Sequence, residues 1–132
     1  MDQDNETVVR RVLERWAVGD FRSGVVDFDS DVVLTIPSEF LEGGESTGFD
    51  EVRDHSRQFM TQYDRVTITA SEVSASGDKV FTAVTQEGRG RTSGIDVRFE
   101  YFIVFSMRDG KVSRMDTIME RSDALRAAGF SD

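Results

Sequence analysis

The chain has 132 residues, of which 38% are hydrophobic, and this is enough for one domain with an apolar core. Its net charge of -9 argues against nucleic acid and anionic membranes as partners, because phosphate groups repel an acidic surface. The absence of cysteine excludes disulfide bonds and thiolate chemistry. The start of the chain is polar and lacks the apolar segment of a signal peptide, so we expect a single cytoplasmic domain over residues 1–132.

Two helices are predicted at the N-terminal end. Apolar residues at three- and four-residue spacing predict the first, which Asp4 or Asn5 can cap, which carries Trp16 on its apolar face and which stops at Gly19. Asp20 is a suitable cap for a short second helix that buries Phe21 and Phe28.

A strand over residues 32–36 comes next and ends with Ile36 before a proline. The following loop, residues 38–48, is rich in glycine and contains Phe40 and Leu41. These two apolar side chains are placed to close the mouth of a pocket.

A third helix is predicted over residues 50–63, with Phe59 and Tyr63 on its apolar face. His55, the single histidine, lies at the edge of that face. An imidazole titrates near neutral pH, so His55 is either a catalytic base or a partly exposed residue on the flank of the helix.

The rest of the chain predicts a sheet, with one hairpin over residues 66–86 and a longer one over residues 97–119 around Asp109-Gly110. A two-residue turn in the long hairpin would pair Phe105 with Arg114 and mix charge into an apolar row. A three-residue turn gives one almost wholly apolar face, so we predict the pairs Phe99–Met119, Tyr101–Thr117, Ile103–Met115 and Phe105–Ser113.

These elements predict an α+β fold, a cone-shaped, curved antiparallel sheet packed by three N-terminal helices, with a short last helix over residues 122–128. A bent sheet closed by helices leaves a conical pocket. No helix is left for the back of the sheet, so we expect a homodimer through an apolar strip made of Phe102, Val104, Val112 and Ile118.

Several segments resemble the SnoaL-like family of the nuclear transport factor 2-like superfamily. They are the junction at residues 16–20 (WAVGD), Gly48, the turn at residues 109–112 (DGKV) and the tail at residues 120–130 (ERSDALRAAGF). The resemblance covers nearly the whole chain and implies the cone fold, with enzymes that need no cofactor and non-catalytic binders both present in the superfamily. In polyketide cyclases of this type, the acid/base aspartate corresponds to Thr117 and its histidine partner to Ile103.

Three residues are candidates for catalysis. His55 could act as a base, and the hydroxyl of Tyr101 could donate a hydrogen bond to a carbonyl or enolate oxygen. Tyr101 could equally form a buried hydrogen bond with Thr117. Asp116 adjoins the cyclase aspartate position, but the predicted register turns it to the back of the sheet, where a charge pair with Arg98 or Arg114 is the alternative.

The sequence therefore predicts a hydrophobic pocket for a small apolar molecule of polyketide, steroid or terpenoid type, without metal or cofactor. The alternative is a cofactor-free isomerase or cyclase that uses acid/base chemistry on a carbonyl compound. The predicted ligand-binding residues are Trp16, Ile36, Phe40, Phe59, Tyr63, Phe99, Tyr101, Ile103, Met115, Thr117 and Met119.

Overall fold

The computed structural model describes residues 2–38, 40 and 43–130, so Leu41 of the predicted mouth loop lies outside the described residues. Its elements in chain order are α1 (Asp2–Trp16), the 3-10 helix η1 (Ser23–Asp27), β1 (Phe28–Ile36), β2 (Gly44–Thr47), α2 (Phe49–Thr61), β3 (Tyr63–Ser76), β4 (Lys79–Gly90), β5 (Asp96–Arg108), β6 (Lys111–Ile118) and α3 (Arg121–Ala127).

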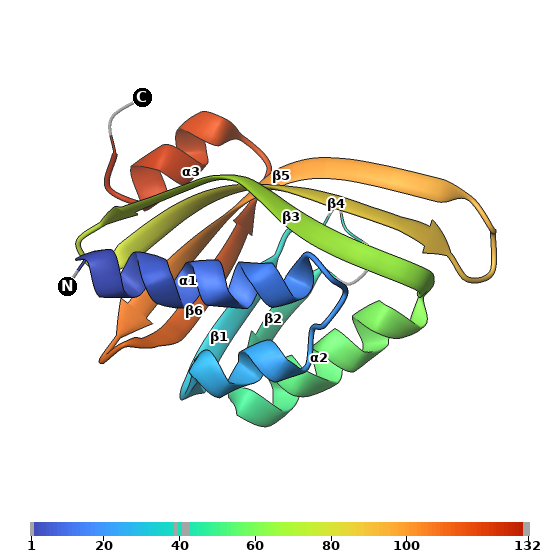
Figure 1. Ribbon diagram of the computed structural model, residues 1–132, viewed down its shortest axis with the longest axis horizontal. Helices are drawn as coiled ribbons and strands as arrows, with labels where there is room; N and C mark the ends of the chain where they lie inside the picture. Colours follow the sequence, from blue (N-terminus) through green and yellow to red (C-terminus); the bar gives the residue numbers. More distant parts are fainter. Residues whose placement is uncertain (1, 39, 41–42, 131–132) are drawn as a thin grey trace.

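The described strands form one curved sheet in the order β2-β1-β6-β5-β4-β3 (Figure 1). The α+β fold with a curved sheet is therefore confirmed, but the sheet is mixed rather than antiparallel, because β1 pairs in parallel with β6. The two hairpins were predictable from their turn residues. The β1–β6 pair joins distant parts of the chain without a turn, so no local signal gives its direction.

Two bulges in the sheet each contain an extra serine. Ser71 of β3 has no partner on β4, and Ser113 of β6 has none on β5. In both bulges the serine hydroxyl donates a hydrogen bond to a carbonyl of the neighbouring strand, to Ala83 O at 3.3 Å and to Ser106 O at 3.0 Å. Bulges bend and twist a sheet, and these two contribute to its curvature.

The predicted register of the long hairpin is wrong by two residues. The turn has two residues, Asp109 and Gly110, both with positive φ (52° and 77°) as a type I′ turn requires. The bulge at Ser113 then shifts the ladder, and the observed pairs are Phe105–Met115 and Ile103–Thr117. A shift of two residues leaves each side chain on its face, so the predicted apolar face is correct although its pairs are not.

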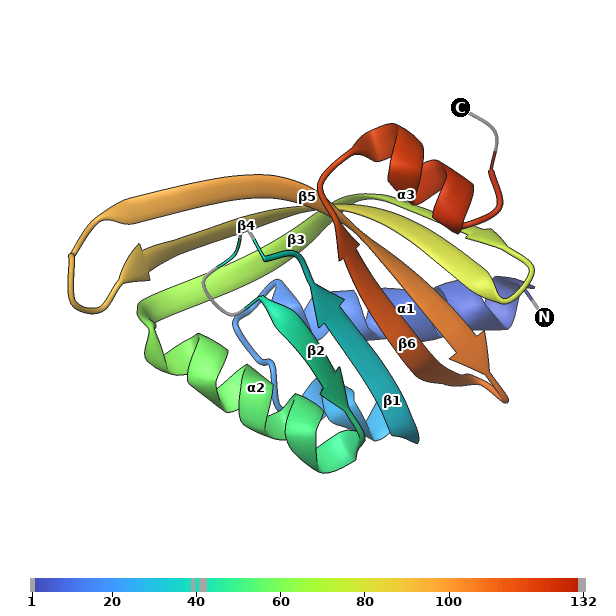
Figure 2. The ribbon, with the colours of Figure 1, turned by 180° about the vertical axis from the view of Figure 1, so that it is seen from behind.

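The helices lie on both sides of the sheet. The helices α1 and α2 and the 3-10 helix cover the inner, concave face, whereas α3 packs on the opposite side (Figures 1 and 2). The expectation that no helix covers the back face is wrong for the part under α3, because Val104 is 1% exposed there. Val112, also assigned to the back strip, instead belongs to the inner core.

Local signals placed most helix ends well. Asp20 Oδ1 accepts hydrogen bonds from the backbone N–H groups of Arg22 and Ser23, at 3.1 and 3.0 Å, which is the predicted cap. The element that follows is a 3-10 helix rather than an α-helix. The helix α2 ends at Thr61, so Tyr63 begins β3 instead of ending the helix. No helix in the described ranges combines the length and apolarity that crossing a bilayer requires.

Candidate functional site

A cavity of about 350 Å³ lies between the inner face of the sheet and the helices that cover it. The curved sheet supplies residues from β1, β3, β4, β5 and β6, and α1 and α2 close the other side. Its aromatic walls are in contact with one another. The ring centroids of Phe59 and Tyr63 are 5.5 Å apart, and those of Phe40 and Tyr101 are 5.4 Å apart.

The structure brings ten of the eleven predicted ligand-binding residues to this cavity. They are Trp16, Ile36, Phe40, Phe59, Tyr63, Phe99, Tyr101, Ile103, Met115 and Thr117. Met119 is not in the wall; it follows the end of β6 and is 38% exposed.

A buried polar chain crosses one wall of the cavity. The hydroxyl of Tyr101 donates a hydrogen bond to Gln86 Oε1 at 2.7 Å, and Gln86 Nε2 donates to the hydroxyl oxygen of Tyr63 at 3.1 Å. Gln86 is 6% exposed and Tyr101 is 5% exposed. The amide thus fixes both tyrosine hydroxyls at the cavity wall, and we call these three residues the Tyr-Gln-Tyr chain. The predicted partner of Tyr101, Thr117, instead pairs with Ile103 across the two strands.

Gln86 was not among the residues predicted to line the pocket. The strand β4 is apolar on both faces, with Val80 and Val84 inward and Phe81 outward, so alternation gives no clear direction for the polar residue at its end. Counting in steps of two from Val84 would have placed Gln86 on the inner face. Its opposite residue on β5 is Phe99, which also lines the cavity.

The helix α2 presents His55, Ser56 and Phe59 to the cavity. His55, the single histidine of the sequence, is half-buried in this wall. The neighbouring residue Val52 is 1% exposed and anchors this face of the helix in the core. His55 and Tyr101 therefore reach the same cavity, from opposite walls.

Asp116 is the candidate that the structure does not bring to the cavity. It alternates with the wall residues Met115 and Thr117 and points to the outer face of the sheet. There its carboxylate accepts a hydrogen bond from Thr35 Oγ1 at 2.7 Å and from Arg114 Nε at 3.0 Å. The charge pair with Arg114 is thus present, and Asp116 does not line this cavity.

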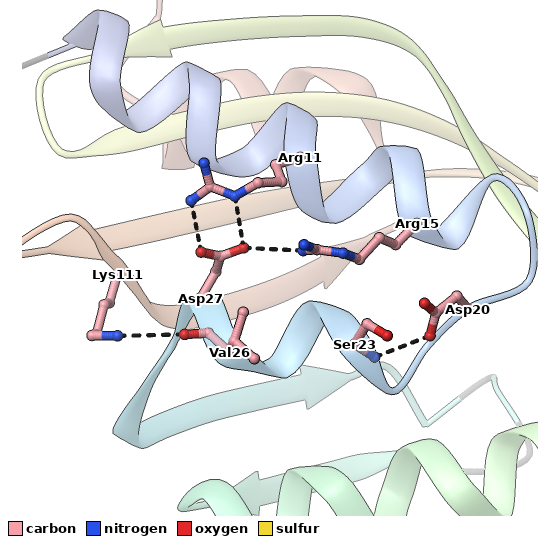
Figure 3. A network of polar contacts seen from close by, with 7 residues as sticks. All are labelled: Arg11, Arg15, Asp20, Ser23, Val26, Asp27 and Lys111. Atoms are coloured by element: carbon pink, nitrogen blue, oxygen red, sulfur yellow. Dashed lines mark hydrogen bonds and ion pairs between the residues drawn. The ribbon is translucent and has the colours of Figure 1, made fainter.

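A second polar cluster holds the helical side of the cavity in place. Asp27 accepts hydrogen bonds from Arg11 (2.7 and 3.1 Å) and from Arg15 (3.3 Å), as Figure 3 shows. The hydrogen bond from Arg11 is the main cause that lowers the pKa of Asp27 below its ordinary range. This contact ties α1 to the segment that carries Phe21 and Phe28, two further residues of the cavity wall.

The chemistry available at the cavity is that of an apolar container with a few hydrogen-bonding groups. Among residues 2–38, 40 and 43–130, no three histidine, cysteine or acidic side chains gather in a way that could hold a metal ion. The curved sheet and the helices that cover it form a nuclear transport factor 2-like fold. Residues 9–115 match the SnoaL-like domain, and the chain belongs to this family.

Individual proteins are similar to this chain at low sequence identity. An uncharacterised protein of Schizosaccharomyces pombe, C11D3.04c, is 25% identical over 98% of both chains. A candidate SnoaL-like polyketide cyclase from Jannaschia sp. CCS1 has a TM-score of 0.77 and 15% identity, with 96% of this chain and 92% of that chain covered. TerC, solved after co-crystallisation with polyporic acid, has a TM-score of 0.76 and 20% identity, with coverages of 95% and 97%.

Proposed function

We propose that this protein binds a small apolar molecule with one polar end in the cavity of its cone. The observation that carries the proposal is the combination of an apolar cavity of about 350 Å³ with a single buried Tyr-Gln-Tyr chain in its wall. Small-molecule sites are typically apolar hollows of this size with a few well-placed polar groups.

The polar end of the ligand is expected at the Tyr-Gln-Tyr chain, because a buried polar group without a partner is costly. A hydroxyl or carbonyl oxygen fits, since tyrosine and glutamine offer both donors and acceptors. The co-crystallisation of TerC with polyporic acid supports the proposal that a small molecule occupies the same fold here.

The test uses 2-naphthol, an apolar bicycle with one hydroxyl, as the probe. Trp16, the single tryptophan, lines the cavity, so its fluorescence should fall as 2-naphthol binds. The variant Thr117→Phe places a ring in the cavity and should weaken binding about tenfold or more.

The matched control is Thr69→Phe, the same substitution at an exposed position of β3. It should leave the quenching of Trp16 unchanged. Saturable quenching that persists in folded Thr117→Phe would show that the probe binds elsewhere, and the absence of quenching in the wild type would refute the proposal.

Acid/base catalysis on a carbonyl compound is the second candidate function, and the presence of His55 and Tyr101 in one cavity favours it. A base there would remove a proton from the carbon beside a carbonyl group, and a tyrosine hydroxyl would donate to the enolate oxygen. We expect faster exchange of the α-hydrogens of 2-tetralone in D2O, lost in His55→Asn with little change in melting temperature. If His55→Asn exchanges as fast as the wild type, His55 is not the base.

We also propose that the protein acts as a homodimer through the outer face of its sheet. Phe102 and Ile118 are partners on β5 and β6 that pack against the cluster under α3 but stay only half-buried, and this apolar surface supports the proposal.

A further inference from the structure

A second hollow, of about 420 Å³, lies beside the cavity, between α2 and the segment that leads into β2. The two hollows share four wall residues, Leu34, Ile36, His55 and Gln62, so they adjoin along one wall. The second hollow is more open to solvent, and we call it the polar groove.

The polar groove differs from the cavity in chemistry. Beyond the shared residues, its side chains are Glu45, Ser46 and Gln58, with backbone from Gly43 and Gly44. Among the described residues that line it there is no lysine, arginine, phenylalanine, tyrosine or tryptophan. The groove thus offers amide and hydroxyl groups, one imidazole and one carboxylate.

Gly44 keeps the groove open where β2 begins. Its φ of 140° is a conformation that L side chains rarely adopt, and a Cβ at this position would meet no atom within 4 Å. On the facing helix, His55, Gln58 and Gln62 follow one another at spacings of three and four, so they form one polar ridge along α2 and its C-cap.

We propose that the ligand is a two-part molecule, whose apolar ring system lies in the cavity and whose neutral, hydroxyl-rich arm, such as a sugar, lies in the polar groove. This inference rests on the proposed binding function and adds the chemical class of the ligand. Amides and hydroxyls both donate and accept, as sugar hydroxyls do. An anionic arm would meet Glu45 and a protein of net charge -9 without an arginine or lysine partner among the described groove residues.

The arm can be tested with three compounds that keep the same rings and one free hydroxyl for the Tyr-Gln-Tyr chain. They are 2,6-dihydroxynaphthalene, its mono-β-D-glucoside and its monosulfate. In titrations followed through Trp16, we expect the glucoside to bind about three- to tenfold more tightly than the parent diol, as a few new neutral hydrogen bonds would give. The sulfate should bind more weakly than the diol.

Variants of the groove residues test whether the hydroxyl-rich arm of the ligand lies in the polar groove. Gln58→Ala and Ser46→Ala should reduce the preference for the glucoside to near unity, while the affinity for the diol stays unchanged. Gln58→Lys should instead strengthen binding of the sulfate, because it supplies a cation in the groove. The control is Arg57→Ala, a neighbouring exposed position of α2 outside both hollows, which should change none of the three affinities.

The outcomes separate the two proposals. If the diol binds but the glucoside has no advantage, or if Gln58→Ala and Arg57→Ala behave alike, the arm is wrong and the apolar cavity stands. If none of the three compounds binds to the folded protein, the proposed function fails and the arm fails with it.

Discussion

Gln86 determines what the two tyrosines of the cavity can do. A lone buried tyrosine can turn its hydroxyl toward any acceptor, but the amide of Gln86 accepts from Tyr101 and donates to Tyr63. A hydroxyl that accepts a hydrogen bond becomes a somewhat better donor, so this order polarises Tyr63 as a donor. The Tyr-Gln-Tyr chain is therefore suited to a ligand oxygen.

We predict that Gln86→Leu, which keeps the shape but removes the amide, lowers the preference for 2-naphthol over naphthalene by about three- to tenfold. The ratio of the two dissociation constants is the measurement, because a general loss of stability affects both probes alike. Thr82→Val is the control: Thr82 is buried in the same strand, donates to Ile103 O at 2.8 Å and is absent from the cavity wall. An unchanged preference in Gln86→Leu would contradict the role assigned to the Tyr-Gln-Tyr chain.

At the level of elements, the sequence predicted which segments are helices and strands better than it predicted how the strands pair. Apolar periodicity and turn residues placed the helices, both hairpins and the apolar face of β5 and β6. The register failed because the extra residue, Ser113, lies inside a strand and has no local signal that separates it from a regular strand position. The parallel β1–β6 pair was missed because it joins distant parts of the chain. Gln86 was missed because β4 is apolar on both faces, although its spacing of two from Val84 places it on the inner face.

The contact between α1 and η1 depends on one carboxylate. Asp27 is 8% exposed, and both Arg11 and Arg15 donate to it. The folded protein lowers its pKa below the ordinary value of 3.8, chiefly through the hydrogen bond from Arg11. A lowered folded pKa stabilises the fold above the unfolded pKa, and this contribution disappears as the pH falls through the folded value.

We predict that Asp27→Asn lowers the free energy of unfolding by about 2 kcal/mol at pH 7, as the loss of charged hydrogen bonds implies. The difference from the wild type should be constant between about pH 7 and 5 and shrink below about pH 4. Urea titrations at several pH values measure it. Asp31→Asn, at an exposed position of β1, is the control and should change the free energy of unfolding little. An equal loss in both variants would mean that Asp27 contributes no more than an ordinary surface charge.

On the scale of the whole molecule, α3 divides the outer face of the sheet. It covers Phe81, Ala83 and Val104, and Arg121 at its start pairs with Glu72 at 2.6 Å. The part of the outer sheet face that α3 does not cover carries charged side chains of both signs, among them the exposed pair Arg98 and Glu100. A suitable two-fold axis through such a surface would pair Arg98 of one copy with Glu100 of the other, which is compatible with a homodimer.

We therefore predict a dimer at micromolar concentration, and sedimentation equilibrium is the measurement. Ile118→Arg should give a folded monomer, because it places a charge in the centre of the proposed interface, on a side chain that is only partly buried. Ile95→Arg is the matched control, because Ile95 is 62% exposed in the loop between β4 and β5, and this variant should remain a dimer. A wild-type protein that sediments as a monomer would show that Phe102 and Ile118 are sufficiently covered by their own chain.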